Sequence, residues 1–155
     1  MTTYRMANTP EDFAVGVRLF KEYAASLPID LSFQDFENEL RTASLQYNTP
    51  VGALVLVHSD TDPVGCAGIR SLEPGIAELK RMYLRPLYRG QGIGRVLMEH
   101  CIATARDLGY QRIRLDTLAH MVQAIGLYRA SGFTEIQAYR YNPFAGAVYM
   151  EKVLE

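Results

Sequence analysis

Three glycines at alternate positions, Gly90, Gly92 and Gly94, lie between a strand-like run and a helix-like run. The run before them, Leu79 to Leu84, is mostly apolar, and the run after them, Ile93 to Leu108, carries apolar residues at helical spacing. Glycine adopts backbone conformations closed to other residues and lets backbone amides approach a ligand closely. A helix that begins there directs unpaired N–H groups and its positive dipole end at the same point. The sequence therefore predicts a strand, a turn that binds a phosphate or pyrophosphate, and a helix.

The spacing of the glycines narrows the choice of ligand. A dinucleotide fingerprint, G-x-G-x-x-G, and a nucleoside-triphosphate loop, G-x-x-x-x-G-K, would both require glycine at position 95 if they began at Gly90. Arg95 occupies that position, so both nucleotide interpretations fail. The pattern that fits is R-x-x-G-x-G, formed by Arg89, Gly92 and Gly94.

At this motif the chain resembles the GNAT superfamily of acetyl-coenzyme A-dependent N-acetyltransferases, in which the motif binds the pyrophosphate of coenzyme A. The run from Glu78 to Tyr110 looks like the family's central strand, loop and helix, and the run from Ala124 to Phe133 resembles its last helix and the following turn. The resemblance covers the second half of the chain. It implies that acetyl-CoA is the co-substrate and that an amine is acetylated.

Charge is distributed unevenly along the chain, although the formal net charge is only −1. Residues 1–69 hold four basic and nine acidic residues, whereas residues 70–114 hold nine basic and four acidic ones. The basic stretch contains the glycine loop, which suits a polyanionic ligand, although a solvated basic face would give the same count. With a pI near 6.3 and no basic tail, the chain is not expected to bind nucleic acid.

Length and composition predict one domain that spans residues 1–155 and buries a core without disulfides or structural metal. The N-terminus lacks the basic flank and apolar stretch of a signal peptide, and no apolar run is long enough to span a membrane. We therefore expect a cytoplasmic protein that does not bind membranes. Cys66 and Cys101 are far apart in sequence, so no metal site is expected and two buried thiols are the simpler interpretation.

Periodicity and turn chemistry predict an α+β fold, in which two early helices and an antiparallel meander precede alternating helices and strands. The second helix is expected to begin at Ser32, to carry apolar Phe33 and Phe36, and to end near Tyr47. The resemblance adds that the sheet is mixed and mostly antiparallel, and that its two central strands splay apart around the cofactor. The expected strands are Tyr4 to Ala7, Ala53 to Val57, Val64 to Ile69, Ile76 to Leu84, Arg112 to Thr117, Thr134 to Ala138 and Ala147 to Leu154; the other expected helices begin at Pro10, Ile93 and Met121 and end near Leu27, Leu108 and Ser131.

Glu78 and Tyr128 are the candidate catalytic residues. Glu78 stands in an apolar strand context, where burial would raise its pKa toward that of a general base, and the resemblance places it where many members keep a catalytic glutamate. The structural alternatives are an ion pair with Lys80 or Arg81, or a charge on an edge strand that deters aggregation. The resemblance implies that Tyr128 faces the cofactor sulfur as general acid, whereas its structural alternative is a core aromatic residue.

The resemblance also implies how the cofactor is held. Backbone N–H groups of Met82, Tyr83 and Leu84 would meet the pantetheine and the thioester oxygen, and the loop from Arg89 to Arg95, including Gln91 and Ile93, would bind the pyrophosphate. Many relatives carry an asparagine seven residues before the tyrosine, and here that residue is Met121. Whether His120 replaces this contact, acts as a base or simply caps a helix stays open.

The acceptor is predicted to be a small primary amine, attacked directly in a ternary complex. The early helices and the tail from Tyr139 to Tyr149 would line the acceptor side in this fold, and Arg70, Lys80 and Arg81 could bind the carboxylate of an amino-acid-like amine. A non-catalytic acyl-CoA sensor or interaction module would use the same loop but would need neither Glu78 nor Tyr128. Transfer of a longer acyl group and a homodimeric state also stay open.

Overall fold

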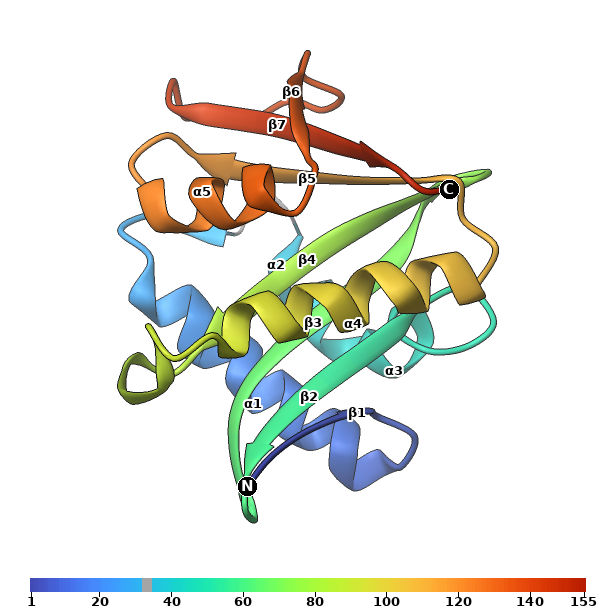
Figure 1. Ribbon diagram of the computed structural model, residues 1–155, viewed down its shortest axis with the longest axis vertical. Coiled ribbons are helices and arrows are strands. Elements are labelled where there is room, and N and C mark those ends of the chain that lie inside the picture. Colours follow the sequence, from blue (N-terminus) through green and yellow to red (C-terminus); the bar gives the residue numbers. More distant parts are fainter. Residues whose placement is uncertain (32–34) are drawn as a thin grey trace.

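The computed structural model describes residues 1–31 and 35–155, which form one mixed sheet with helices on both faces (Figure 1). The strands are β1 Thr2–Met6, β2 Ala53–Ser59, β3 Asp62–Glu73, β4 Ile76–Leu84, β5 Arg112–Leu118, β6 Thr134–Ile136 and β7 Ala147–Val153. The helices are α1 Pro10–Ser26, α2 Phe36–Arg41, α3 Ala43–Gln46, the short 3₁₀ helix η2 Pro86–Tyr88, α4 Ile93–Asp107 and α5 Val122–Ala130.

The strand order is β1-β2-β3-β4-β5-β7-β6, and every neighbouring pair is antiparallel except β4 with β5. Because β4 and β5 run parallel, the chain must cross over between them, and α4 makes that connection. The predicted α+β fold with a mostly antiparallel mixed sheet is confirmed.

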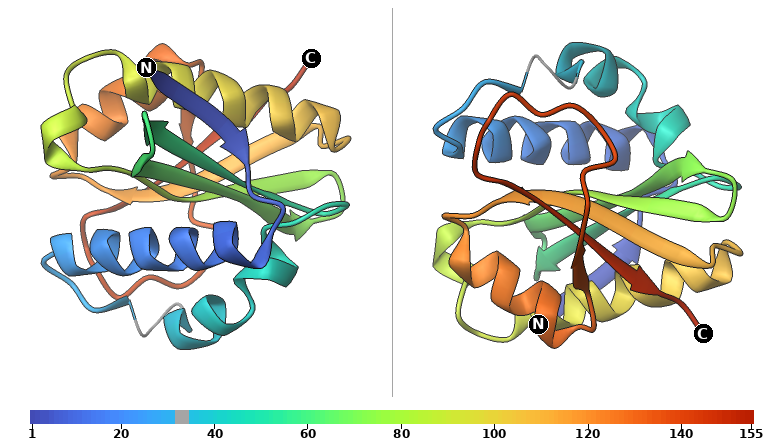
Figure 2. Two further views of the ribbon diagram at one scale, coloured as in Figure 1. Left: turned by 90° about the horizontal axis from the view of Figure 1, so that it is seen from below. Right: turned by 90° about the horizontal axis from the view of Figure 1, so that it is seen from above.

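Helices cover the sheet as two layers (Figure 2). In both views α4 and α5 lie on one face, and α1, α2 and α3 lie on the other. The segment 137–146, between β6 and β7, passes onto the α1 face, which brings it beside the middle of the sheet.

The β2 strand shows why the central strands are continuously apolar. Val55 and Val57 pack in the core beneath α4, whereas Leu54 and Leu56 pack in the core beneath α1. A strand buried on both faces has no solvent side on which to place polar residues. The sheet therefore has a hydrophobic core on each face, one shared with α4 and the other shared with α1.

Element boundaries follow the local signals in most places. Thr9 accepts a hydrogen bond from the Asp12 amide and Pro10 opens α1, as the capping pattern predicts. The second predicted helix is interrupted at Thr42, whose hydroxyl donates to the Asn38 carbonyl, so α2 and α3 are separate turns. Its expected start at Ser32 and its apolar Phe33 lie outside the described residues.

The last strands differ slightly from the expected ranges. The strand predicted from Thr134 to Ala138 ends at Ile136, because the chain then leaves the sheet for the α1 face. None of the helices in the described part combines the length and apolar character that a membrane-spanning helix requires.

Candidate active site

The sheet opens between β4 and β5. Their parallel pairing covers only Ile76–Glu78 against Arg112–Arg114, although both strands continue beyond it. On its other side β5 stays paired with β7 as far as Leu118. The splay that the resemblance implied is therefore present, and it frees the second half of β4 to face a ligand instead of a strand.

A β-bulge bends β4 where it faces this opening. Cys66 pairs with Tyr83 and Gly68 pairs with Lys80, so β4 carries one residue more than β3 between these pairs. Arg81 lies in the bulge with a φ of +57°, a conformation that is uncommon for a residue with a side chain. The bulge redirects the backbone of the segment from Met82 to Leu84.

Buried contacts of Arg81 fix the bulge. Its guanidinium donates to both carboxylate oxygens of Glu39, at 3.0 and 2.7 Å, and its plane lies over the Phe36 ring at 5.2 Å. Tyr47 donates a further hydrogen bond of 2.8 Å to Glu39. Burial opposes the charge of Glu39, but these hydrogen bonds and the field of Arg81 outweigh it and lower its pKa. This network holds α2 and α3 against the strained part of β4.

The predicted anion loop has the backbone geometry that its glycines suggested. Gly90 and Gly92 have φ angles of +76° and +83°, and a Cβ at either position would meet nothing within 4 Å. Gly92 is the N-cap of α4 and supplies no side-chain cap, so the first amides of the helix are left without a capping side chain. Arg89 bridges the loop to the strand, because its Nε donates to the Leu84 carbonyl at 2.9 Å. The loop is thus an open cradle of N–H groups that fits a pyrophosphate.

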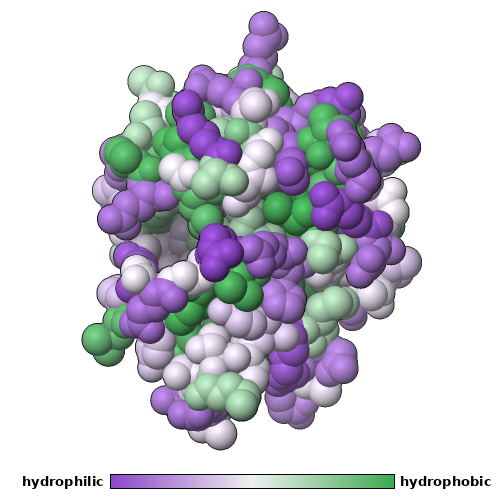
Figure 3. Space-filling model, viewed as in Figure 1, coloured by the Kyte–Doolittle hydropathy of each residue, from purple (hydrophilic) through white to green (hydrophobic). Residues whose placement is uncertain are grey.

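A cavity of about 500 Å³ leads from this loop to the splay. The end of α1, the end of β4, the first turn of α4 and the first turns of α5 line it, and Met82, Tyr83, Leu84, Arg89 and Gly94 are among its walls. The space-filling view shows the hollow between α5 and the loop that precedes α4 (Figure 3). Its size and mixed lining suit an elongated ligand. We refer to it as the donor cavity.

Other residues predicted to bind the cofactor lie beside the donor cavity. Ile93 is buried in the core beneath α4, and Gln91 holds the turn by donating to the Leu87 carbonyl at 3.0 Å. Arg95 is exposed and pairs with Glu99 one helical turn later. These three residues therefore support the loop and the start of α4, and none of them lines the donor cavity.

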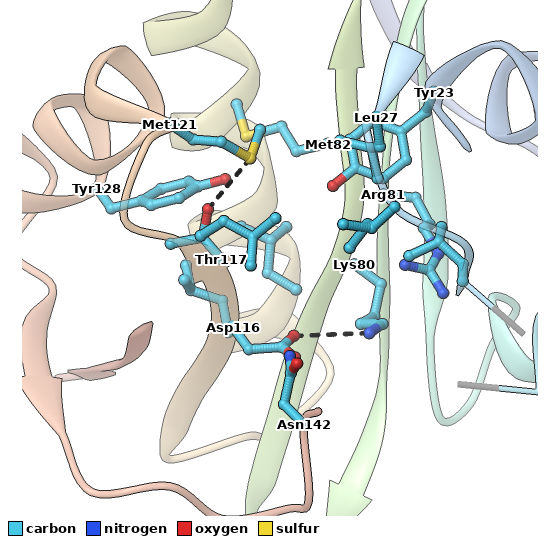
Figure 4. A pocket seen from close by; sticks show the side chains of 15 residues that line it. Tyr23, Leu27, Lys80, Arg81, Met82, Asp116, Thr117, Met121, Tyr128 and Asn142 are labelled. Atoms are coloured by element: carbon cyan, nitrogen blue, oxygen red, sulfur yellow. Dashed lines mark hydrogen bonds and ion pairs between the residues drawn. The ribbon is translucent and has the colours of Figure 1, made fainter. Parts of the chain in front are cut away.

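A second, smaller cavity of about 50 Å³ lies in the splay itself (Figure 4). Lys80, Arg81 and Met82 from β4 line one side, and Asp116, Thr117 and Tyr128 lie opposite. Asn142 reaches it from the segment 137–146. We call it the acceptor cavity. Five residues line both cavities: Tyr23, Leu27, Met82, Met121 and Tyr128.

Tyr128 stands at this junction. It is 9% exposed, its ring packs against Phe133 at 6.0 Å, and its hydroxyl points into the space between β4 and β5 (Figure 4). Burial raises the pKa of the phenol, and the nearby Tyr23 and Asp116 add to the shift, so the hydroxyl keeps its proton at neutral pH. The side chain is therefore a core aromatic residue whose protonated hydroxyl faces the cavities.

Glu78 is fully buried, but its predicted raised pKa is wrong. Arg70 lies 3.0 Å from Oε1, Tyr139 donates to Oε2 at 2.8 Å, and Arg140 pairs with the same oxygen. Burial alone would raise the pKa, but the field of Lys80, Arg140 and Arg70 and the hydrogen bond from Arg140 outweigh it and lower the pKa to about 2. Such a carboxylate is a weak proton acceptor at neutral pH.

The structural alternative for Glu78, an ion pair, is the arrangement observed, with different partners from those expected. Arg70 comes from the adjacent β3, and Arg140 belongs to the segment 137–146, while Lys80 acts through its field. Sequence reasoning could not supply Arg140, because it lies 62 residues away in an irregular segment. Glu78 thereby ties the acceptor-side segment to the centre of the sheet.

Sequence reasoning also missed Tyr23, Leu27 and Asp116. The first two lie at the C-terminal end of α1, and only the packing of that helix against the sheet brings them to the cavities. Asp116 gave no clear signal, because polar and apolar residues alternate along β5 and Asp116 stands at a polar position; its burial, to 6% exposure, comes from the fold. Met121, which stands where many relatives carry asparagine, lines both cavities, and its sulfur accepts a hydrogen bond from Thr117 at 3.6 Å. His120 is exposed and lines the donor cavity.

Both thiols are buried and free, and burial raises the pKa of each, to about 12 for Cys101. Cys66 donates to the Arg81 carbonyl at 3.4 Å, so this thiol supports the bulge. Within residues 1–31 and 35–155, no group of three His, Cys, Asp or Glu side chains is arranged to hold a metal ion.

The chain matches the model of the acetyltransferase (GNAT) family over residues 17–133. It is 33% identical over 143 residues to an uncharacterized N-acetyltransferase from Schizosaccharomyces pombe, a match that covers 91% of this chain and 88% of that protein. Its fold is shared by a GNAT-family acetyltransferase from Staphylococcus aureus (TM-score 0.79, 20% identity, 100% of both chains). A Salmonella typhimurium protein solved with its cofactor acetyl-CoA also shares the fold (TM-score 0.75, 17% identity, 100% of this chain and 95% of that one). The chain therefore belongs to the GNAT family, acyltransferases that use acetyl-CoA as their acetyl donor.

Proposed function

We propose that this enzyme transfers the acetyl group to a primary amine by direct attack in a ternary complex, with Tyr128 as the general acid. The observation that carries this proposal is the position of the Tyr128 hydroxyl, where the donor and acceptor cavities share their walls. Two cavities that meet at one proton donor suit two substrates bound together, and a covalent acyl-enzyme is not required.

The glycine loop and the end of β4 position the donor. The loop from Arg89 to Arg95 holds the pyrophosphate through the N–H groups at the start of α4, as its positive φ glycines and open space allow. Backbone N–H groups of the segment from Met82 to Leu84 meet the thioester oxygen, since this part of β4 lacks pairing with β5. The bulge at Arg81 keeps that segment in place before the substrate arrives.

Acetyl-CoA supplies an acetyl group already activated as a thioester. The acceptor loses one proton to solvent to become a neutral amine, and its nitrogen then forms the new bond to the carbonyl carbon as the carbon–sulfur bond breaks. Tyr128 gives its proton to the departing sulfur, and the second proton leaving the nitrogen restores the phenol. Because its pKa is raised, Tyr128 holds that proton across the neutral range.

Glu78 has a different role in this scheme from the one first expected. With a pKa of about 2 and contacts to Arg70, Tyr139 and Arg140, it stays ionised and fastens the segment 137–146 beside the acceptor cavity. Asn142, two residues after Arg140, lines that cavity. Glu78 thus acts as a positioning residue for the acceptor side.

The direct test is release of free thiol from acetyl-CoA on addition of amines, with the acetylated amine identified by mass. We expect thiol release that depends on the amine and follows sequential kinetics. Ping-pong kinetics, or an acetylated enzyme isolated without acceptor, would contradict the ternary complex.

Coenzyme A should raise the melting temperature of the protein, and Gly92→Asp should abolish that shift. At a ligand concentration of about 100 times Kd, linkage adds roughly 2.7 kcal/mol to the free energy of unfolding. Aspartate places a side chain and a negative charge in the cradle. Thermal unfolding with and without coenzyme A measures both effects.

Gly109→Asp is the matched control for this experiment. Gly109 lies at the opposite end of α4 with a φ of +92°, and a Cβ there also meets nothing within 4 Å. Both substitutions therefore carry similar backbone strain, but only the one at Gly92 reaches the ligand. A normal shift in folded Gly92→Asp protein would count against the loop as the binding site.

A further inference from the structure

Lys80 and Asp116 face each other across the splay. They come from β4 and β5, respectively, and the Lys80 ammonium lies 3.7 Å from an Asp116 oxygen (Figure 4). Their side chains are only 2% and 6% exposed, yet both line the acceptor cavity. A positive and a negative group therefore stand side by side on the wall of a small cavity in the middle of the protein.

The neighbouring cations also have carboxylate partners. Arg70 and Arg140 pair with Glu78, and Arg81 pairs with Glu39 through two hydrogen bonds. Taken together, the four cations Arg70, Lys80, Arg81 and Arg140 exceed the three carboxylates Glu39, Glu78 and Asp116 by one charge. These seven side chains thus carry a net charge of +1, which favours an acceptor that brings a negative group.

The lowered pKa of Lys80 is consistent with this net positive charge. Burial is the main cause that lowers the pKa of Lys80, to about 8, and the nearby Arg81 lowers it further, while Glu78 and Asp116 raise it. A bound carboxylate would oppose the first two effects and stabilise the ammonium. Asn142 and Thr117 line the same cavity and add polar groups that can form hydrogen bonds.

We propose that the acceptor cavity binds the zwitterionic head of an amino acid, with its carboxylate at Lys80 and its amine at Asp116. This inference rests on the proposed N-acetyltransferase function and names its substrate class. The head of an α-amino acid carries its two charges a few ångströms apart, which matches the spacing of the pair. In the form that reacts, with its amine neutral, the amino acid carries one negative charge and balances the excess of one positive charge. An acceptor without a carboxylate leaves that excess in place.

The orientation follows from the strands. Asp116 precedes Thr117 on β5, and Tyr128 lies on the same side of the opening, so the amine is placed nearer the general acid than the carboxylate is (Figure 4). After it loses one proton to solvent, the neutral amine still donates a hydrogen bond to Asp116 and keeps its lone pair for attack. Lys80 holds the carboxylate on the β4 side.

The test compares each free amino acid with its amide and with the amine that lacks the carboxylate, for example alanine, alaninamide and ethylamine. We expect kcat/KM for thiol release to be at least about 10²-fold higher for the best free amino acids than for their amides. The amine of an amide is less basic, so the concentration of neutral amine cannot produce this preference. Equal or better turnover of the amides would overturn the inference.

Binding to the protein saturated with coenzyme A separates this inference from the proposed function. If no amine is acetylated, the proposed function fails, yet calorimetric titration with the same amino acids and amides still tests the site. We expect the amino acid to bind and the amide to bind at least about 10-fold more weakly. Equal affinity for the two would overturn the inference by itself.

Lys80→Met should remove the discrimination between amino acid and amide, because methionine keeps the length of the side chain without its charge. Lys152→Met is the matched control, since Lys152 lies on β7 and lines neither cavity. Discrimination that persists in folded Lys80→Met protein would contradict the inference. If that variant does not fold, the comparison of substrates on the unaltered enzyme decides the question.

Discussion

Replacing Tyr128 with phenylalanine should lower turnover by about 10²-fold and leave the affinity for coenzyme A nearly unchanged. The ring of Tyr128 packs against Phe133, and phenylalanine keeps that packing. The substitution removes only the hydroxyl that faces the junction of the two cavities, and general acid catalysis typically contributes about 10²- to 10⁴-fold. Single-turnover measurements isolate the chemical step, and calorimetry measures the affinity for coenzyme A.

Tyr110→Phe is the control for this substitution. Tyr110 also donates its hydroxyl hydrogen within the protein, to the Val51 carbonyl, but it lines neither cavity. The Tyr110→Phe variant should therefore retain full turnover. If Tyr128→Phe is equally active when chemistry limits the rate, Tyr128 is a packing residue and the sulfur takes its proton from solvent.

Glu78→Gln should cost about 3 kcal/mol of folding free energy and lower the melting temperature by roughly 10 °C at neutral pH. Glutamine keeps the size of the side chain but leaves Arg70 and Arg140 beside a neutral group in a largely buried site. Glu99→Gln is the control, because Glu99 pairs with Arg95 at the exposed surface. This substitution should lower the free energy of unfolding by less than about 1 kcal/mol. Thermal or urea unfolding measures both.

The stability difference should depend on pH in one direction. The folded-state pKa of Glu78 is lowered to about 2 from an ordinary value of 4.5, so its contribution is complete above that ordinary value. It is lost as the pH falls from about 4.5 toward 2. The curves of unfolding free energy for Glu78→Gln and the unaltered protein should therefore converge in acid. Constant separation over this range would show that the carboxylate is not stabilised in its charged form.

The kinetics of Glu78→Gln distinguish a positioning role of Glu78 from a role as general base. If Glu78 fastens the segment 137–146, Glu78→Gln raises KM for the acceptor more than KM for acetyl-CoA, and its pH–rate profile keeps the original shape. A general base would instead lose its titration limb and about 10²- to 10⁴-fold in turnover. Loss of that limb in the folded variant would restore Glu78 as the base.

Local physical chemistry determined most of the secondary structure. The capping pattern at Thr9 and Pro10 and the apolar runs of the strands act over a few residues, so the sequence alone predicts them. Gly90 and Gly92 belong to the same class, since a positive φ is a property of one residue. The conformation of the glycine loop was therefore predictable from its own residues, and the family of the chain was predictable from the motif that these residues form.

The chemistry of the buried side chains was decided by the tertiary structure. A carboxylate within an apolar strand can have its pKa raised by burial or lowered by cations, and the choice at Glu78 depends on Arg70 from the next strand and Arg140 from a distant segment. Lys80 and Asp116 likewise become a pair only because β4 and β5 part after three paired residues. Electrostatic energies depend on distances in space and on burial, and neither quantity is fixed until the chain has folded.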